Sequence, residues 1–182
     1  MRLQNLSLKK VLIQRFSGPT NLKIDDDINL VKVETAEEMF LATQKSLPTD
    51  VAIFAAAVAD FKLQKKFTNK IKKQETLNLN LEKNVDILNY VSNHNSMRPG
   101  LVIGFEAETD NHKKNAEEKL STKNCDWIIS NDVANKNIGF NSDFNEVTIH
   151  YKNKKINNEK LFYKKKSEIS DEIVDRIIDQ LN

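Results

Sequence analysis

A cluster of lysines follows an acidic residue at the end of an apolar segment in the first half of the chain. Residues 51–60 read VAIFAAAVAD, and Lys70, Lys72 and Lys73 follow Asp60 after a short polar stretch. A run of small and β-branched residues is typical of a strand buried on both faces, and ligands of open α/β sheets bind where such strands end. Because lysine side chains neutralise phosphate charge, the pattern predicts a nucleotide site at this strand end.

The same residues also have ordinary structural explanations. Asp60 can accept hydrogen bonds from ribose hydroxyls or help to hold a metal ion, but it can equally cap the backbone amides of the next loop. Lysines that alternate along a loop point partly to water, so we expect one of the three to meet a phosphate. The residue types alone leave both explanations open.

Two further segments could contribute to such a site. In IGFEAET, residues 103–109, Gly104 permits close approach of the backbone, and Phe105 could form an aromatic wall for a base, although the spacing favours a core position. Lys119 and Lys123 are four residues apart on one face of an expected helix and could reach the same anion. Surface lysines at this spacing are common, so the spacing alone does not decide.

Several other kinds of site are disfavoured by the sequence. The chain has neither GxGxxG nor GxxxxGK[ST], and its three histidines, His94, His112 and His150, lack metal-ligand spacing and are expected at the surface. Cys125 is the only cysteine, so an internal disulfide is impossible, and we expect its thiol to pack in the core. A reducing cytoplasm fits this composition.

The bulk composition is that of one ordinary domain. The chain has 182 residues, of which 39% are hydrophobic and 30% charged, and a formal net charge of +2. This charge is too small to indicate a nucleic-acid partner, and no apolar run approaches the roughly 20 residues that span a membrane. We expect a single domain over residues 1–182.

Apolar strands alternate with amphipathic helices along most of the chain, which predicts an α/β fold. Thr35 and Glu38 form a capping-box pattern at the start of the first helix. The expected strands are 10–14, 29–34, 51–57, 77–81, 101–105, 127–130, 146–151 and 155–163, and the expected helices are 35–46, 86–94, 111–122 and 167–181. The prediction is a Rossmann-like three-layer fold with a mostly parallel sheet, a C-terminal antiparallel hairpin and a final helix.

Six segments, taken in order, resemble the phosphopantothenate-cysteine ligase family. This family forms the C-terminal half of the bacterial bifunctional coenzyme A biosynthesis flavoprotein, whose separate N-terminal domain is a decarboxylase. The resemblance runs from about Ser17 to the C-terminus, and six segments in register are far more specific than one. They are AAAVADF at 55–61, NKIKKQ at 69–74, KNVDIL at 83–88, IGFEAET at 103–109, EKLSTKNCDWIISNDV at 118–133 and GFNSDFNEVTI at 139–149.

The resemblance implies a CTP-dependent ligase that uses Mg²⁺ and binds no flavin in this domain. The carboxylate of 4'-phosphopantothenate would attack the α-phosphorus of CTP, and the amine of cysteine would then displace CMP from the acyl-cytidylate. Lys70 would be the catalytic residue, on a flap that closes over the intermediate. The other implied CTP contacts are Asp60, Asn84, Val85, Asp86, Ile87, Phe105, Lys119 and Lys123. A homodimer is also implied, with a flavin-binding decarboxylase domain encoded elsewhere.

The chain departs from the family pattern in two places. Val85 stands where the family usually has proline, so the start of the next helix is less preorganised. Residues 1–16 match poorly, and the family's first strand, glycine-rich turn and helix, with an asparagine that stabilises the acyl-cytidylate, have no counterpart. We therefore expect the 182-residue chain to be weakly active or inactive, and a non-catalytic nucleotide-binding or dimer-forming remnant is the alternative.

Overall fold

The computed structural model describes residues 12–20, 28–65, 76–108, 112–132 and 142–182. The chain divides into two compact units, each built from two stretches of sequence. The first unit is Met1–Ser46 with Val58–Val85, and the second is Leu47–Ala57 with Asp86–Asn182. The lysine-rich segment 66–75, which includes Lys70, lies outside the described residues.

The first unit contains two small sheets and a helix. Strands β1 (Gln14–Ser17) and β2 (Asn29–Lys32) pair in parallel, and helix α1 (Ala36–Lys45) contacts β1. Strands β4 (Phe61–Leu63) and β5 (Leu81–Lys83) form an antiparallel ribbon. The expected capping box is confirmed: the Glu38 amide donates to Thr35 Oγ1 at 3.1 Å, and Glu38 Oε2 accepts from the Thr35 amide at 3.2 Å.

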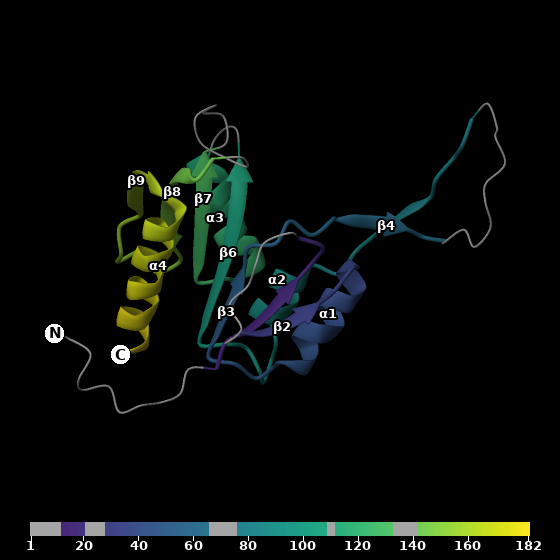
Figure 1. The fold of residues 1–182 in the computed structure, drawn as a ribbon, viewed down its shortest axis with the longest axis horizontal. Coiled ribbons are helices and arrows are strands. Elements are labelled where there is room, and N and C mark those ends of the chain that lie inside the picture. The colour runs from purple at the N-terminus through teal and green to yellow at the C-terminus, as the bar shows by residue number, and fades with distance from the viewer. Residues whose placement is uncertain (1–11, 21–27, 66–75, 109–111, 133–141) are drawn as a thin grey trace. The chain divides into compact units, whose positions relative to one another are not determined.

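The second unit is built on a five-stranded mixed sheet with the order β3-β6-β7-β8-β9 (Figure 1). Strands β3 (Val51–Phe54), β6 (Leu101–Glu108) and β7 (Trp127–Asp132) are parallel. Strands β8 (Phe144–Tyr151) and β9 (Glu159–Lys165) continue the sheet in antiparallel fashion. The expected α/β class and C-terminal hairpin are confirmed, while two of the four pairings in this sheet are antiparallel.

Helices cover both faces of this sheet, which gives the three expected layers (Figure 1). On one face, helix α4 (Lys166–Leu181) packs Ile169, Ile173 and Ile177 onto the sheet. On the other face, Ala116 and Leu120 of helix α3 (His112–Lys123) pack on Val102 and Ile128, and Leu88 of helix α2 (Ile87–Ser92) joins them. Burial of both sheet faces explains the nearly continuous apolar runs in β6 and β7.

Several element ends differ from the sequence prediction. Strand β3 ends at Phe54, three residues before the expected end, and Ala55, Ala56 and Ala57 are exposed. Strand β5 begins only at Leu81, where the expected strand ends, and β1 begins at Gln14 instead of residue 10. No helix within the described ranges is long and apolar enough to cross a membrane.

Candidate functional site

Two lysines of α3 each form an ion pair with a carboxylate on another element. One carboxylate lies near the end of β6, and the other lies at the start of α2. The ammonium of Lys119 lies 2.8 Å from Oε2 of Glu106, and Lys123 forms an ion pair with Oδ2 of Asp86. Both lysine side chains are about one third exposed, at 38% and 33%. The four-residue spacing therefore places two partly exposed ammonium groups along one helix, each with a partner on a different element.

The carboxylate of Asp86 has two roles: it caps the start of α2, and it pairs with Lys123. Its extended backbone ends the preceding segment, and its Oδ1 accepts a hydrogen bond from the Asn89 amide at 2.9 Å. The neighbouring Ile87 is buried and anchors the helix, whereas Val85 is 50% exposed. Asp86 is thus an N-cap without a proline before it, and both its carboxylate oxygens already have partners.

Glu106 is a buried acid that the sequence analysis did not single out. Only 2% of its side chain is exposed, although it lies in a strand whose neighbouring inward residues are Val102 and Gly104. Alternation along β6 places these three residues on one face. The signal in the sequence was a charged residue at an inward position of an otherwise apolar strand.

Phe105 and Gly104 have different environments although they are adjacent. Phe105 is 38% exposed, so it is not the core residue that its spacing favoured, and its ring is accessible to a ligand. Gly104 is enclosed: a Cβ at this position would lie 2.9 Å from Ile128 Cδ1 and 2.9 Å from Leu88 Cδ2. The close approach expected at Gly104 is therefore made by α2 and β7 side chains.

Asp60, Asn84 and Val85 belong to the first unit, at the base of the β4–β5 ribbon. The Asn84 amide donates to the Asp60 carbonyl at 2.8 Å, and Asn84 Nδ2 donates to the Ala59 carbonyl at 2.7 Å. These bonds use backbone oxygens, and the Asp60 residue is exposed. The structure therefore brings Asp60 together with Asn84, and Asp86 together with Lys123. Ile87 directly follows Asp86, and Lys70 lies outside the described residues.

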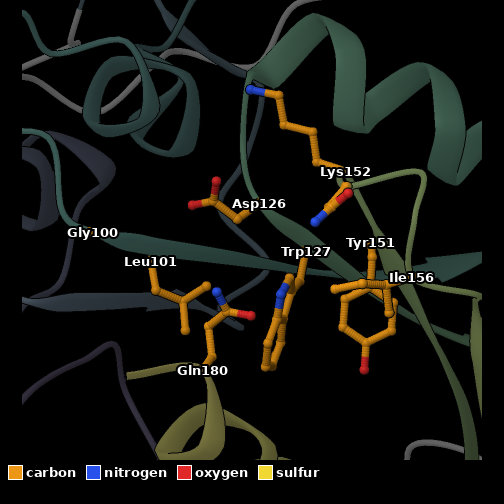
Figure 2. Close-up of a pocket in the computed structure, with 9 residues that line it drawn as sticks. Gly100, Leu101, Asp126, Trp127, Tyr151, Lys152, Ile156 and Gln180 are labelled. Atoms are coloured by element: carbon orange, nitrogen blue, oxygen red, sulfur yellow. The ribbon is translucent and has the colours of Figure 1, made fainter. Parts of the chain in front are cut away.

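A hollow of about 270 Å³ opens at the end of the second unit where the parallel strands β6 and β7 begin (Figure 2). Leu101 and Trp127, the first residues of β6 and β7, line it together with Tyr151. None of the predicted site residues lines it. Because ligands of such sheets bind at the carboxyl ends of the strands, we place the candidate site at the other end, beside Glu106 and Lys119.

Arg98 and Asp126 brace the strand starts beside this hollow. Arg98 Nη2 lies 3.0 Å from Asp126 Oδ2, and Asp126 Oδ2 also accepts from the Val102 amide at 2.8 Å. Arg98 Nε donates to the Ser92 carbonyl at 2.8 Å. These contacts join α2, β6 and β7, which explains the polar residues here without a ligand.

The clearest pKa shifts occur away from the candidate site. Burial raises the pKa of the Cys125 thiol to about 11, and burial together with the neighbouring Glu159 raises the pKa of Tyr151 to about 12. The hydrogen bonds from Arg176, at 2.7 and 2.5 Å, lower the pKa of Glu159. Cys125 is fully buried, in agreement with a packing role.

The expectation that all three histidines lie at the surface is wrong for His150. His150 is 3% exposed, its Nε2 lies 2.9 Å from Ser130 Oγ, and its Nδ1 lies 3.2 Å from Asn158 Nδ2. Asn158 Oδ1 accepts from the Tyr151 amide, so Asn158 presents its NH₂ group to Nδ1. Hydrogen bonds on both nitrogens, with Ser130 of β7 and with Asn158 just before β9, allow this imidazole of β8 to be buried.

Comparisons with known proteins find similar sequences over most of the chain. The model of the DNA/pantothenate metabolism flavoprotein C-terminal domain matches residues 8–181. The coenzyme A biosynthesis bifunctional protein CoaBC of Haemophilus influenzae is 36% identical over 166 residues, which cover 90% of this chain and 40% of that protein. The chain therefore spans well under half the length of this relative.

Two solved structures share the fold. The crystal structure of the C-terminal domain of coenzyme A biosynthesis bifunctional protein CoaBC has a TM-score of 0.74 and 30% identity, and the match covers 93% of this chain and 74% of that one. The Cab2 mutant H337A in complex with phosphopantothenate-cysteine has a TM-score of 0.51 and 19% identity, with coverage of 75% and 47%. At that identity, the second match shows the fold alone.

Proposed function

The chain belongs to the DNA/pantothenate metabolism flavoprotein C-terminal domain family, and from this membership we propose that it joins 4'-phosphopantothenate to cysteine at the expense of CTP. The site feature that best supports this proposal is the pair of partly exposed ammonium groups on α3, Lys119 and Lys123. Two cations four residues apart suit the phosphates of one nucleotide. The solved structure of the Cab2 mutant H337A is a complex with phosphopantothenate-cysteine, which is the product that this reaction would form.

The reaction has two steps. A carboxylate oxygen of 4'-phosphopantothenate attacks the α-phosphorus of CTP, and the bond to the β-phosphate breaks to release pyrophosphate. The amine of cysteine then attacks the acyl carbon, an amide forms, and CMP leaves with the electrons of the acyl–oxygen bond. We propose that Lys119 and Lys123 hold the phosphates, that Lys70 contacts the acyl-cytidylate, and that the exposed ring of Phe105 packs against the nucleotide.

We propose that the remaining predicted site residues also contact the nucleotide. Asp60, Asn84, Val85, Asp86 and Ile87 would contact CTP, with the cytidine part recognised by residues 84–87. The side chain of Asp86 would act on CTP only indirectly, because its carboxylate pairs with Lys123 and caps α2. Its contribution is to fix Lys123 and the start of α2.

Mg²⁺ is expected with the triphosphate in this reaction. In the described ranges, no group of three His, Cys, Asp or Glu side chains could hold a metal ion, and Asp86 and Glu106 are both engaged with lysines. The ion would therefore be held mainly by phosphate oxygens and water, as is usual for Mg²⁺.

A homodimer is the assembly that we propose. On one face of the β4–β5 ribbon, Phe61, Leu63 and Leu81 are 53%, 38% and 59% exposed, and Leu63 lies directly opposite Leu81. A contiguous apolar face of this kind favours association. A flavin-binding decarboxylase domain would be a separate partner, and the free Cys125 fits the cytoplasm as the working compartment.

The test of the function is an assay of CMP release. The full chain would be incubated with CTP, Mg²⁺, 4'-phosphopantothenate and cysteine, and the products separated by chromatography. We expect slow CMP release that requires both acceptor substrates and is abolished by Lys70→Ala. CTP protection against thermal unfolding without any CMP would instead support the alternative of a non-catalytic nucleotide-binding remnant.

A further inference from the structure

The buried carboxylate of Glu106 has an unusual environment at the carboxyl end of β6. The ammonium of Lys119 lies 2.8 Å from its Oε2, but among the described residues neither oxygen accepts a hydrogen bond of normal geometry. A carboxylate is expensive to bury, and it becomes tolerable only when a cation or several donors compensate it. The charge of Glu106 is therefore balanced mainly by Lys119.

A contribution to the stability of the fold does not by itself explain this ion pair. The inward neighbours of Glu106 on β6 are Val102 and Gly104, and an apolar residue would continue that face. Replacing a buried ion pair by apolar residues of similar volume is often neutral or stabilising. The acid at position 106 is better explained by what it does to its partner.

The effect on Lys119 is to limit the freedom of its ammonium group. A lysine side chain has a flexible four-carbon stem and three donors on its nitrogen. The carboxylate engages the ammonium from the protein side, while 38% of the lysine side chain stays exposed. The ammonium group is therefore engaged by the carboxylate while the side chain stays partly accessible to an anion from solvent.

Lys123 is restrained in a similar way by Asp86, four residues further along α3. The Asp86 carboxylate is itself fixed, because its Oδ1 accepts the Asn89 amide. Two ammonium groups on one helix are thus each restrained by a carboxylate from another element. Such an arrangement is preorganised for an extended anion with several charges.

We propose that Glu106 is a positioning residue, which orients the ammonium of Lys119 towards the phosphates of the bound nucleotide. This inference rests on the proposed function, and it adds a residue to which the site prediction gave no role. In protein kinases, a glutamate similarly positions the lysine that meets the nucleotide phosphates. The carboxylate also repels a phosphate, but the ammonium lies between the two anions, so we expect positioning to dominate.

The first part of the test measures whether the tether exists. The full chain and the variant Glu106→Gln would be treated briefly with an amine-acetylating reagent, and modified lysines quantified by peptide mass spectrometry. Glutamine keeps the shape of the side chain and removes its charge. We expect faster acetylation of Lys119 in Glu106→Gln, with the exposed Lys114 unchanged as an internal reference. Unchanged labelling of Lys119 would overturn the proposal whatever the function.

The second part measures Mg²⁺·CTP binding by calorimetry. Glu106→Gln should raise the dissociation constant roughly fivefold to twentyfold, less than complete loss of a contact to a charged group, because the lysine is misplaced and not removed. The matched control Glu117→Gln removes an exposed charge from the same helix and should change little. In a Lys119→Ala background, Glu106→Gln should have no further effect on binding.

The outcomes separate this inference from the function on which it rests. Equal losses in both backgrounds would indicate a purely structural role and overturn the inference, as would faster labelling with unchanged CTP affinity in Glu106→Gln. If the unmodified chain binds no CTP, the proposed function fails and the inference fails with it. Thermal melting of each variant identifies loss of folding, and the conservative variant Glu106→Asp, which keeps the charge, then provides the second comparison.

Discussion

The proposed phosphate contacts involve four side chains whose charges cancel in pairs. Lys119 with Glu106 and Lys123 with Asp86 form two ion pairs along α3, and both lysines remain about one third exposed. Neither a partly exposed ion pair nor one with a buried carboxylate adds much to stability, and we propose that these pairs orient the two ammonium groups. A nucleotide phosphate would share each ammonium with its carboxylate without having to order a free lysine side chain.

At the residue scale, the buried thiol of Cys125 predicts a loss of stability at alkaline pH. Its pKa is raised by burial to about 11, above its ordinary value. The folded state therefore holds this proton more tightly than the unfolded state, so its stabilising effect is complete below the ordinary value and is lost as the pH rises towards 11. Urea unfolding between about pH 8 and pH 10.5 measures this effect.

The control for this prediction is Cys125→Ala. This variant should be less stable than the unmodified chain at about pH 8, because it leaves a cavity, but its stability should fall less steeply with pH. Tyr151, whose pKa is also raised, is present in both chains and does not contribute to the difference. Parallel pH profiles for the two chains would contradict the prediction.

The sequence predicted the environment of some side chains and missed that of others for a physical reason. The spacing of Lys119 and Lys123 placed them on one helix face, because helical geometry is local. Glu106 and His150 were missed because their burial depends on α3 and on neighbouring strands, which are distant in sequence. Phe105 was expected in the core for the same reason, yet it is 38% exposed.

At the scale of elements, α4 is the part of the second unit that its sequence predicts best. Ile169, Ile173 and Ile177 recur every four residues and all three are buried against the sheet. Arg176 ties the same helix to β9 through its bonds to Glu159 at 2.7 and 2.5 Å. Strand ends were predicted less well, because the exposed Ala55–Ala57 continue the composition of β3 without its pairing.

Removal of one α4 side chain should measure this packing. Ile173→Ala is expected to lower the free energy of unfolding by about 2–5 kcal/mol, through lost burial and a cavity. Val174→Ala, on the same helix but at a position that is 50% exposed, is the matched control and should change stability by roughly 0.5 kcal/mol or less. Urea denaturation followed by circular dichroism gives both values, and equal losses would contradict the packing of α4.

At the scale of the whole molecule, two units are interleaved along one chain. The chain enters the second unit at Leu47, returns to the first at Val58 and leaves it again after Val85. Asp60 and Asn84 therefore lie close in sequence to these crossings, while Asp86 begins the second long stretch of the other unit. The single domain expected from composition is thus proposed as one functional domain made of two structural units.

The apolar ribbon face predicts the oligomeric state. Leu81→Lys places a charge on the face that Leu63 shares, and we expect it to convert a homodimer into a monomer of 20.9 kDa. Ile156→Lys, at a position that is 41% exposed in the second unit, introduces the same residue elsewhere and should leave the dimer intact. Sedimentation equilibrium distinguishes the two, and a monomeric unmodified chain would contradict the prediction.

The most direct measurement of the central claim is calorimetric binding of Mg²⁺·CTP to the full chain and to the double variant Lys119→Ala/Lys123→Ala. We expect the unmodified chain to bind CTP more tightly than ATP, and the double variant to lose about tenfold or more in affinity for CTP, because two phosphate contacts are removed. Equal affinity of the two chains for CTP, or no binding by the unmodified chain, would contradict the assignment of this site.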